Sequence, residues 1–129
     1  MEWKLKPIAK VSNGVEETPE DWDVVESELI FRKDYVQGLY RLSHFHHIWV
    51  IFGFHRGPET KLKVHPRRDP SKPLVGVFAS RSPTRPNKLG LTLVELVSVR
   101  GNVVKVRGLD AFDGSPVFDI KPYEEEIDY

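Results

Sequence analysis

Residues 91–106, LTLVELVSVRGNVVKV, carry the pattern that decides the fold. Leu91–Val99 and Asn102–Val106 are rich in β-branched residues, which favour strands. Arg100 and Gly101 lie between them and supply a tight turn, so the stretch predicts a β-hairpin. We therefore expect a fold in which neighbouring strands are joined by short turns.

Further strand candidates lie on both sides of this hairpin. Residues 47–54, HIWVIFGF, form a nearly continuous β-branched and aromatic run that suits a buried strand. The other candidates are Lys4–Val11, Val24–Phe31, Lys61–His65, Val75–Phe78 and Val117–Ile120, and only Tyr35–Leu42 has a helical character. Many short strands with turn signals predict a mainly β protein, a single-domain barrel of antiparallel or mixed strands with one or two short helices.

Composition narrows the class of protein. The chain has 129 residues and no cysteine, so we expect residues 1–129 to form a single domain without disulfides or cysteine-bound metal. The longest apolar run, Ile48–Phe54, is far shorter than the roughly 20 residues that a membrane helix needs. No export signal is visible. These features predict a soluble, cytoplasmic protein with no membrane partner.

Charge is distributed unevenly, although the formal net charge is zero. Residues 56–88 contain nine Lys or Arg and two Asp or Glu, whereas residues 1–55 contain six and nine and residues 89–129 contain four and eight. A segment this basic predicts a phosphate-facing surface if it folds onto one side, and the alternative is an ordinary solvated face. Residues 55–73, rich in Arg, Lys and Pro, are expected to be a surface loop of the same domain.

Two polar motifs lie close to the hairpin. Residues 77–90, VFASRSPTRPNKLG, hold two prolines that stiffen a loop and two arginines whose planar forks suit carboxylate or phosphate. In residues 108–123, GLDAFDGSPVFDIKPY, Asp113-Gly114 predicts a tight turn. Asp110 and Asp119 lie beside large apolar residues, so we expect them to find partners among the loop arginines. The first motif predicts a binding loop, with a plain solvated turn as the alternative.

Together these motifs resemble the TrmO family, also called TsaA-like or YaeB-like. The matching patterns are R-S-P-x-R-P-N-x-x-G, D-x-x-D-G-S/T-P-x-x-D-I-K-P-Y, the segment FHHIWVIF at residues 45–52 and the opening LKPIA at residues 5–9. The chain departs from the family at Lys88, where proline is usual, and at His46, where serine is usual. Residues 15–19 do not reproduce the family's P-x-Q loop, which leaves one wall of the expected site unassigned.

The resemblance implies a TsaA-like β-barrel that uses S-adenosyl-L-methionine to methylate N6-threonylcarbamoyladenosine next to the anticodon of tRNA. It also implies a homodimer with the site near the subunit boundary. Because longer relatives carry an extra carboxyl-terminal domain that helps to hold tRNA, how this chain grips RNA is open. Two alternatives are a module that binds RNA or an adenosine metabolite without catalysis and a methyltransferase that acts on a small molecule.

The resemblance and the charge pattern give candidate site residues. The expected cofactor contacts are His55, Arg56, Arg81, Leu91, Ala111, Phe112, Asp113 and Gly114. The expected substrate or RNA contacts are Arg67, Arg68, Arg85, Asn87, Lys88, Lys121 and Tyr123. Phe112 or Tyr123 would stack on an extruded base, with core packing as the alternative. No residue is assigned as a catalytic base.

Neither a metal nor a Rossmann-type nucleotide site is expected. The sequence has no G-x-G-x-x-G. Three histidines lie close together at residues 44, 46 and 47, but successive side chains of a strand point to opposite faces, so His46 and His47 would not share an ion. We expect His47 to be a hydrogen-bonded packing residue.

Overall fold

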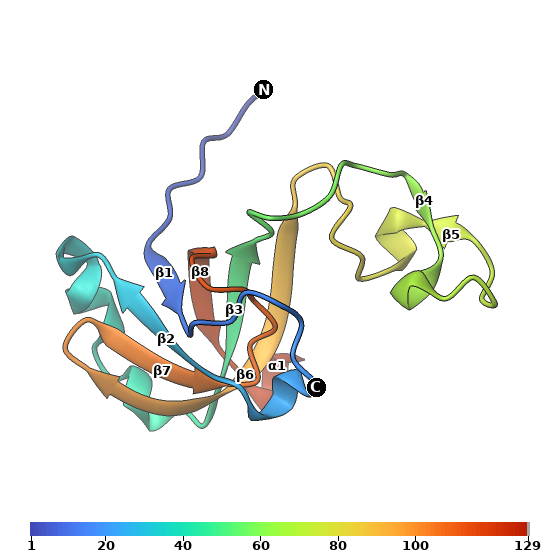
Figure 1. The fold of residues 1–129 in the computed structure, drawn as a ribbon. Coiled ribbons are helices and arrows are strands. Elements are labelled where there is room, and N and C mark those ends of the chain that lie inside the picture. Colours follow the sequence, from blue (N-terminus) through green and yellow to red (C-terminus); the bar gives the residue numbers. More distant parts are fainter. Residues whose placement is uncertain (129) are drawn as a thin grey trace.

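Six strands close into an antiparallel barrel in the computed structural model, which describes residues 1–128 (Figure 1). The order around the barrel is β1-β2-β7-β6-β3-β8, and every hydrogen-bonded pair of neighbours is antiparallel. The strands are β1 (Ala9–Ser12), β2 (Glu26–Phe31), β3 (His47–Gly53), β6 (Leu89–Arg100), β7 (Val103–Arg107) and β8 (Pro116–Pro122). The predicted β-barrel is confirmed.

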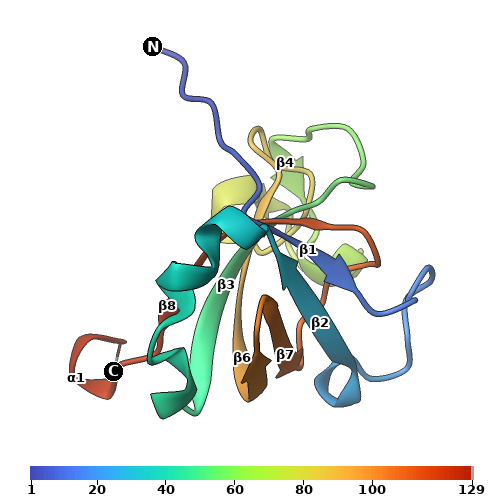
Figure 2. The ribbon, with the colours of Figure 1, turned by 90° about the vertical axis from the view of Figure 1, so that its left-hand side faces the viewer.

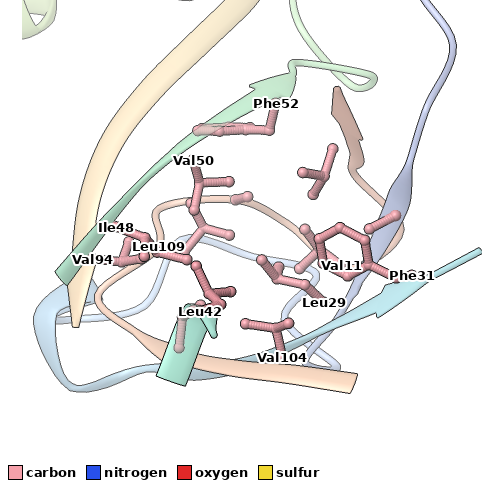
Figure 3. Close-up of a cluster of buried hydrophobic side chains, with 14 of the residues drawn as sticks. Val11, Leu29, Phe31, Leu42, Ile48, Val50, Phe52, Val94, Val104 and Leu109 are labelled. Carbon is pink, nitrogen blue, oxygen red and sulfur yellow. The ribbon is translucent and has the colours of Figure 1, made fainter. Parts of the chain in front are cut away.

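The hairpin of β6 and β7 and the apolar strand β3 form as predicted. Their side chains alternate between the barrel interior and the outer surface, as the two-residue period of a strand requires. On β3, Ile48, Val50 and Phe52 point inward and are at most 1% exposed. With Leu29 of β2 and Val104 of β7 they form the apolar interior shown in Figure 3.

The long connection from β3 to β6 leaves the barrel as a separate arm, which we define as residues 55–88 (Figures 1 and 2). It contains a two-stranded sheet of β4 (Lys63–Val64) and β5 (Val75–Gly76). It also contains two 3-10 turns, η4 (Pro66–Arg68) and η5 (Val77–Ala79). The predicted strands in this region are therefore much shorter than expected.

Two other expectations differ from the structure. Regular strand begins at Ala9 and not at Lys4. Backbone pairing continues only to Ile8, whose amide donates to the Val117 carbonyl and whose carbonyl accepts from the Arg32 amide, and Pro7 before it has no amide hydrogen to donate. The segment expected to be helical consists of the 3-10 helices η2 (Lys33–Leu39) and η3 (Leu42–His44). Gly38, a poor α-helix former, lies within η2.

The remaining short elements are the 3-10 turn η1 (Trp22–Val24) and the helix α1 (Glu125–Asp128), which lies on the surface. Residues 1–7 are exposed and extend away from the barrel without regular structure (Figure 1). Within the described residues, no helix is both long and apolar enough to cross a membrane.

Candidate functional site

Both long motifs meet at one end of the barrel. β3 ends and β6 begins there, since Gly53 pairs with Leu89 and the Phe54 amide donates to the Lys88 carbonyl at 2.9 Å. β8 begins at the same end, where Val117 pairs with Phe52. Residues 110–115 immediately precede β8, so antiparallel pairing brings the second motif to the base of the arm.

A cavity of about 200 Å³ opens at this end of the barrel. Four of the expected cofactor contacts line it: His55, Arg56, Ala111 and Phe112. The other lining residues are Thr18, Trp22, Phe52, Phe54, Gly57, Pro58, Arg68, Pro83, Asp110 and Ser115. The cavity therefore has an aromatic and apolar wall with a few polar groups, as is typical of small-molecule sites.

The turn that carries Phe112 is anchored by the residues that directly follow β1. Asp113 accepts hydrogen bonds from the Asn13 amide at 2.8 Å and from the Gly14 amide at 3.0 Å. These two bonds, first that from Asn13, lower the pKa of the Asp113 carboxyl below its usual value. Asp113 thus holds the turn from outside the cavity, and Gly114 beside it adopts a left-handed φ of 86°.

Asn13 fixes this arrangement with its side chain as well. Its amide nitrogen donates to the Ala111 carbonyl and to the Ser27 hydroxyl, each at 2.9 Å, while its side-chain oxygen accepts from the Val15 amide at 2.9 Å. Asn13 was not among the predicted site residues. Its only local signal is the Asn-Gly pair that it forms with Gly14, which indicates a turn and says nothing of a distant partner.

The wall left unassigned by the sequence is built by residues 16–22. Thr18 and Trp22 line the cavity, and Trp22 meets Phe112 edge-on with ring centroids 5.6 Å apart. The Arg56 guanidinium lies over the Phe112 ring, 4.6 Å from its centroid. The same guanidinium donates to the Glu16 carbonyl at 2.7 Å. Phe112 is therefore held by an aromatic and a cationic neighbour.

His55 is fixed by a short chain of hydrogen bonds. Its Nδ1 lies 3.2 Å from the Ser115 hydroxyl, and that hydroxyl donates to the Phe112 carbonyl at 2.7 Å. Ser115 is only 2% exposed, so the chain begins inside the protein and ends at an imidazole on the cavity wall. The Ser-Pro step of the second motif was recognised in the sequence, but not its contact with His55.

A larger cavity of about 840 Å³ lies within the arm, between residues 58–74 and residues 80–84 of the first motif. Its cationic lining residues are Lys61, Lys63, Arg67, Arg68 and Arg81, and Ser80, Ser82 and Thr84 also line it. Pro58, Arg68 and Pro83 line both cavities, so the two adjoin. None of the five cations forms an ion pair within the described residues, which leaves a basic groove beside a small apolar one.

The arginines of the loop are held by backbone oxygens. Arg81 donates to the Leu91 carbonyl at 2.7 Å, so these two expected cofactor contacts pair with each other outside the smaller cavity. Arg85 donates to the carbonyls of Ser80 at 2.8 Å and Ser82 at 3.3 Å. Arg85 thus holds the loop to itself, and Arg81 attaches it to β6.

Three cationic residues of the arm have a left-handed backbone. Arg67, Arg68 and Lys88 have φ values of 55°, 57° and 51°, a region that non-glycine residues seldom occupy. Asn87, which precedes Lys88, is exposed. Arg67, Arg68, Arg85, Asn87 and Lys88 therefore all belong to the arm or its return to β6.

Two expected substrate contacts lie elsewhere. Lys121 is paired with Trp49 in the barrel, and Tyr123 packs against Trp49 with ring centroids 6.5 Å apart. Trp49 is near the start of β3, whereas the cavities lie beyond its end. The structure therefore does not bring Lys121 and Tyr123 to the other candidate residues.

The expectation that the aspartates pair with loop arginines is wrong. Asp110 lines the smaller cavity and accepts from the Thr92 hydroxyl at 2.5 Å. Asp119 accepts from its neighbouring Ile120 amide at 2.9 Å and lies 3.6 Å from the Lys121 ammonium. The arginines of the loop donate to carbonyl oxygens of the protein, which explains the error.

The histidine cluster holds no metal-like arrangement. No group of three histidine or carboxylate ligands comes together anywhere in residues 1–128. His47 is exposed on β3, and its side chain forms no hydrogen bond with any of residues 1–128. The expected packing role of His47 is therefore not observed.

Comparison with known proteins places this architecture in a family. Residues 9–129 match the family model of the tRNA-methyltransferase O N-terminal domain. The fold superimposes on the crystal structure of TrmO from Pseudomonas aeruginosa with a TM-score of 0.80 and 28% identity, covering 100% of this chain and 58% of that one.

The named relatives fall into two groups, which differ in their names and in how much of their own length matches this chain. An S-adenosyl-L-methionine-binding protein of Archaeoglobus fulgidus is 41% identical over 96% of this chain and 91% of its own length. A mouse tRNA (adenine(37)-N6)-methyltransferase is 44% identical over 67% of this chain, but over only 20% of its own length. The barrel topology, the two motifs and these similarities agree, and the chain belongs to the TrmO family, matching its N-terminal domain.

Proposed function

We propose that this protein binds S-adenosyl-L-methionine and transfers its methyl group to N6 of N6-threonylcarbamoyladenosine beside the anticodon of tRNA. The observation that carries this proposal is the meeting of the two family motifs at one barrel end, where a small aromatic cavity adjoins a basic groove. A small cofactor and a polyanionic substrate would each find a complementary surface there.

The residues of the smaller cavity fit the cofactor. The electron-rich ring of Trp22 suits a sulfonium, since the Phe112 ring already carries the Arg56 guanidinium. Backbone groups of the turn at residues 111–114 suit adenine or ribose. Asp110 offers a carboxylate for ribose hydroxyls, and Arg56 offers a guanidinium group for a carboxylate. Arg81, which lines the adjoining basic groove, offers a second guanidinium at the edge of the cofactor site. When bound, the cofactor supplies an electrophilic methyl group, and the protein contributes alignment of donor and acceptor.

The basic groove is proposed to hold RNA. Lys61, Lys63, Arg67 and Arg68 lack protein carboxylate partners in the described structure, so their charges are available to phosphates. Arg68 lines both cavities and would lie where the RNA approaches the methyl donor. Charge-neutralising contacts of this kind position a nucleic acid without reading its sequence.

A homodimer is part of the proposal. Leu91, Leu93 and Val97 of β6 expose 44%, 38% and 39% of their surface on the outer face of the barrel. Trp49 and Ile51 of β3 pair with Leu93 and Leu91 and extend this apolar face. A second copy docked there would lie beside Arg81, which bonds the Leu91 carbonyl, and so beside the site.

The alternative is a binding module that holds the cofactor or RNA without catalysis. It is favoured by one observation: the relatives that match over most of their own length, such as that of Archaeoglobus fulgidus, are named only as S-adenosyl-L-methionine-binding proteins. Salt separates the alternatives for the substrate, because RNA affinity falls steeply with ionic strength whereas turnover of a small neutral substrate would not.

The first experiment is calorimetry of S-adenosyl-L-methionine binding, followed by methyl transfer to tRNA with and without the threonylcarbamoyl group. We expect micromolar affinity, about −8 kcal/mol, and methylation of the modified tRNA alone. Arg81→Ala should remove cofactor binding, whereas Arg100→Ala, at the far end of β6, should not. Binding without any methylation would support the binding module, and no binding with or without tRNA would contradict both proposals for the cofactor.

A further inference from the structure

The hydrogen bonds around Ser115 determine which nitrogen of His55 carries a proton. A hydroxyl has one proton to donate, and two oxygens 2.7 Å apart would repel without a proton between them, so the Ser115 hydroxyl must donate to the Phe112 carbonyl. At His55, 3.2 Å away, the same oxygen can then only accept. Neutral His55 therefore carries its proton on Nδ1, and its Nε2 has a free lone pair.

This lone pair is not used by a hydrogen bond within the described part of the protein. His55 lines the smaller cavity, and within residues 1–128 its Nε2 has no hydrogen-bond partner. Gly114 lies beside it and has no side chain to cover the ring; an added Cβ would sit 3.6 Å from Nε2. The imidazole is thus oriented by a buried hydroxyl at Nδ1 and, on an exposed side chain, has no hydrogen-bond partner at Nε2, as a proton acceptor requires.

The charged groups around His55 come from three elements. Lys10 of β1 reaches the same glycine, with its Cε 3.9 Å from the position of an added Cβ, and disfavours a second positive charge on the ring. Asp113 of the turn favours that charge, and its carboxylate interacts with both His55 and Lys10. Arg56 follows His55 in the chain, and Asp110 lines the same cavity.

We propose that His55 is the general base of the methyl transfer and that its Nε2 accepts the N6 proton of the substrate adenosine. This proposal rests on the proposed function. The bond between sulfur and the methyl carbon breaks as the bond between that carbon and N6 forms, and the N6 proton passes to Nε2. The sulfonium becomes a neutral sulfide, the imidazole becomes an imidazolium, and the positive charge is conserved until His55 releases the proton to water.

The other acidic groups of the second motif are less suited to this role. Asp113 is occupied by two backbone amides, and Asp119 faces Lys121 away from the cavity. Asp110 remains in the cavity, but one of its oxygens already accepts from Thr92. Imidazole titrates near neutral pH, where a general base is most effective.

The tautomer can be tested without any activity. Nitrogen-15 NMR of the imidazole should show a proton on Nδ1 of His55 in the free protein at pH 8. Ser115→Ala should weaken this preference, and Ser115→Thr, which keeps the hydroxyl, should restore it. A proton on Nε2 in the wild-type protein would overturn the proposal, whether or not the protein methylates tRNA.

The catalytic role is tested by His55→Gln, which keeps the reach of the side chain but cannot take up a proton. With saturating cofactor and modified tRNA, we expect the single-turnover rate to fall by about 100-fold or more. The wild-type rate should rise with pH between about 5 and 8, and the variant should lose this rise. The matched control is His46→Gln, an exposed histidine outside both cavities, which should keep the wild-type rate and profile.

The possible outcomes are distinct. A His55→Gln rate within threefold of wild type, with the pH dependence intact, would overturn the role of base. So would a defect explained wholly by weaker cofactor binding, because His55 would then be only a cofactor contact. If the wild-type protein binds the cofactor but methylates no tRNA while His55 has the expected tautomer, the proposed function fails and the geometric basis stands.

Discussion

The barrel and the arm are built by different interactions. The barrel encloses a continuous core, whereas the buried side chains of the arm are Val64, Val77 and Thr84. The arm is held by prolines and by hydrogen bonds such as that from the Lys61 amide to the Thr84 carbonyl at 3.0 Å. The arm also carries nine of the 19 Lys and Arg residues. Stability thus resides mainly in one region, and the charge for binding in the other.

The largest expected effect is on the barrel core. Leu29 is fully buried, and Leu29→Ala should lower the free energy of unfolding by about 2–5 kcal/mol, because it leaves a cavity that the closed barrel cannot fill. Leu62→Ala in the arm, 65% exposed, is the control and should change it by less than about 0.5 kcal/mol. Urea unfolding measures both. Equal effects would show that the arm contributes to the same cooperative core.

The second effect concerns binding and should appear only in the arm. Arg67→Gln and Arg68→Gln should each weaken tRNA binding about tenfold and reduce the salt dependence by nearly one counterion each. Arg100→Gln, on the hairpin at the far end of β6, should leave both unchanged. Titrations at several salt concentrations provide the measurement. An unchanged salt slope in the arm variants would contradict a phosphate role for the groove.

The third prediction compares two aspartates that cap turns, one in each region. Hydrogen bonds from Asn13 and Gly14 lower the pKa of Asp113, and those from the Ser71 hydroxyl and amide lower the pKa of Asp69. A depressed folded-state pKa contributes stability above the unfolded value, near 4, and this contribution is lost as pH falls through the folded-state pKa.

Asp113→Asn should therefore lower the melting temperature at pH 7 and flatten its decline below about pH 4. Asp69→Asn should change the global melting temperature less, because the arm lacks a large core. Thermal unfolding from pH 3 to 7 tests the pair. A larger effect of Asp69→Asn would mean that the arm limits global stability.

The smallest effect is expected at a surface ion cluster on the barrel. Arg107 donates to Glu26 at 2.6 Å and to Glu95 at 2.9 Å, and these bonds, first that to Glu26, raise its pKa. All three side chains are at least 39% exposed, so solvent screens the cluster. Arg107→Gln should lower the urea midpoint slightly at low salt, and the difference should vanish at about 1 M salt. A salt-independent loss would indicate a packing role.

The fold was predictable where strands are specified locally. β-branched residues predicted both the hairpin at residues 91–106, with its turn, and the apolar strand β3, and both form. The start of β1 was not predictable, because residues 4–7 alternate like a strand, but backbone pairing with the barrel ends at Ile8. The arm has too few buried residues for a periodic pattern to reveal its two-residue strands.

The motifs of the site were predictable, but the residues that form hydrogen bonds with them were not. The family resemblance implied that His55, Arg56 and Phe112 share a cofactor site, which stays a prediction, and in the structure these three residues line one cavity. The sequence could not indicate that Asn13 anchors the second motif, since that contact spans 98 residues. Nor could it indicate that Arg81 and Arg85 donate to carbonyl oxygens and leave the aspartates to other partners.

The left-handed backbone at Arg67, Arg68 and Lys88 sets two kinds of selection against each other. Glycine would relax all three positions at no steric cost, but each glycine would also remove a positive charge from the arm. Selection for higher stability and selection for higher affinity for anions would therefore favour different residues at these three positions. A directed-evolution campaign scored on heat resistance alone would be expected to lose the groove before it damaged the barrel.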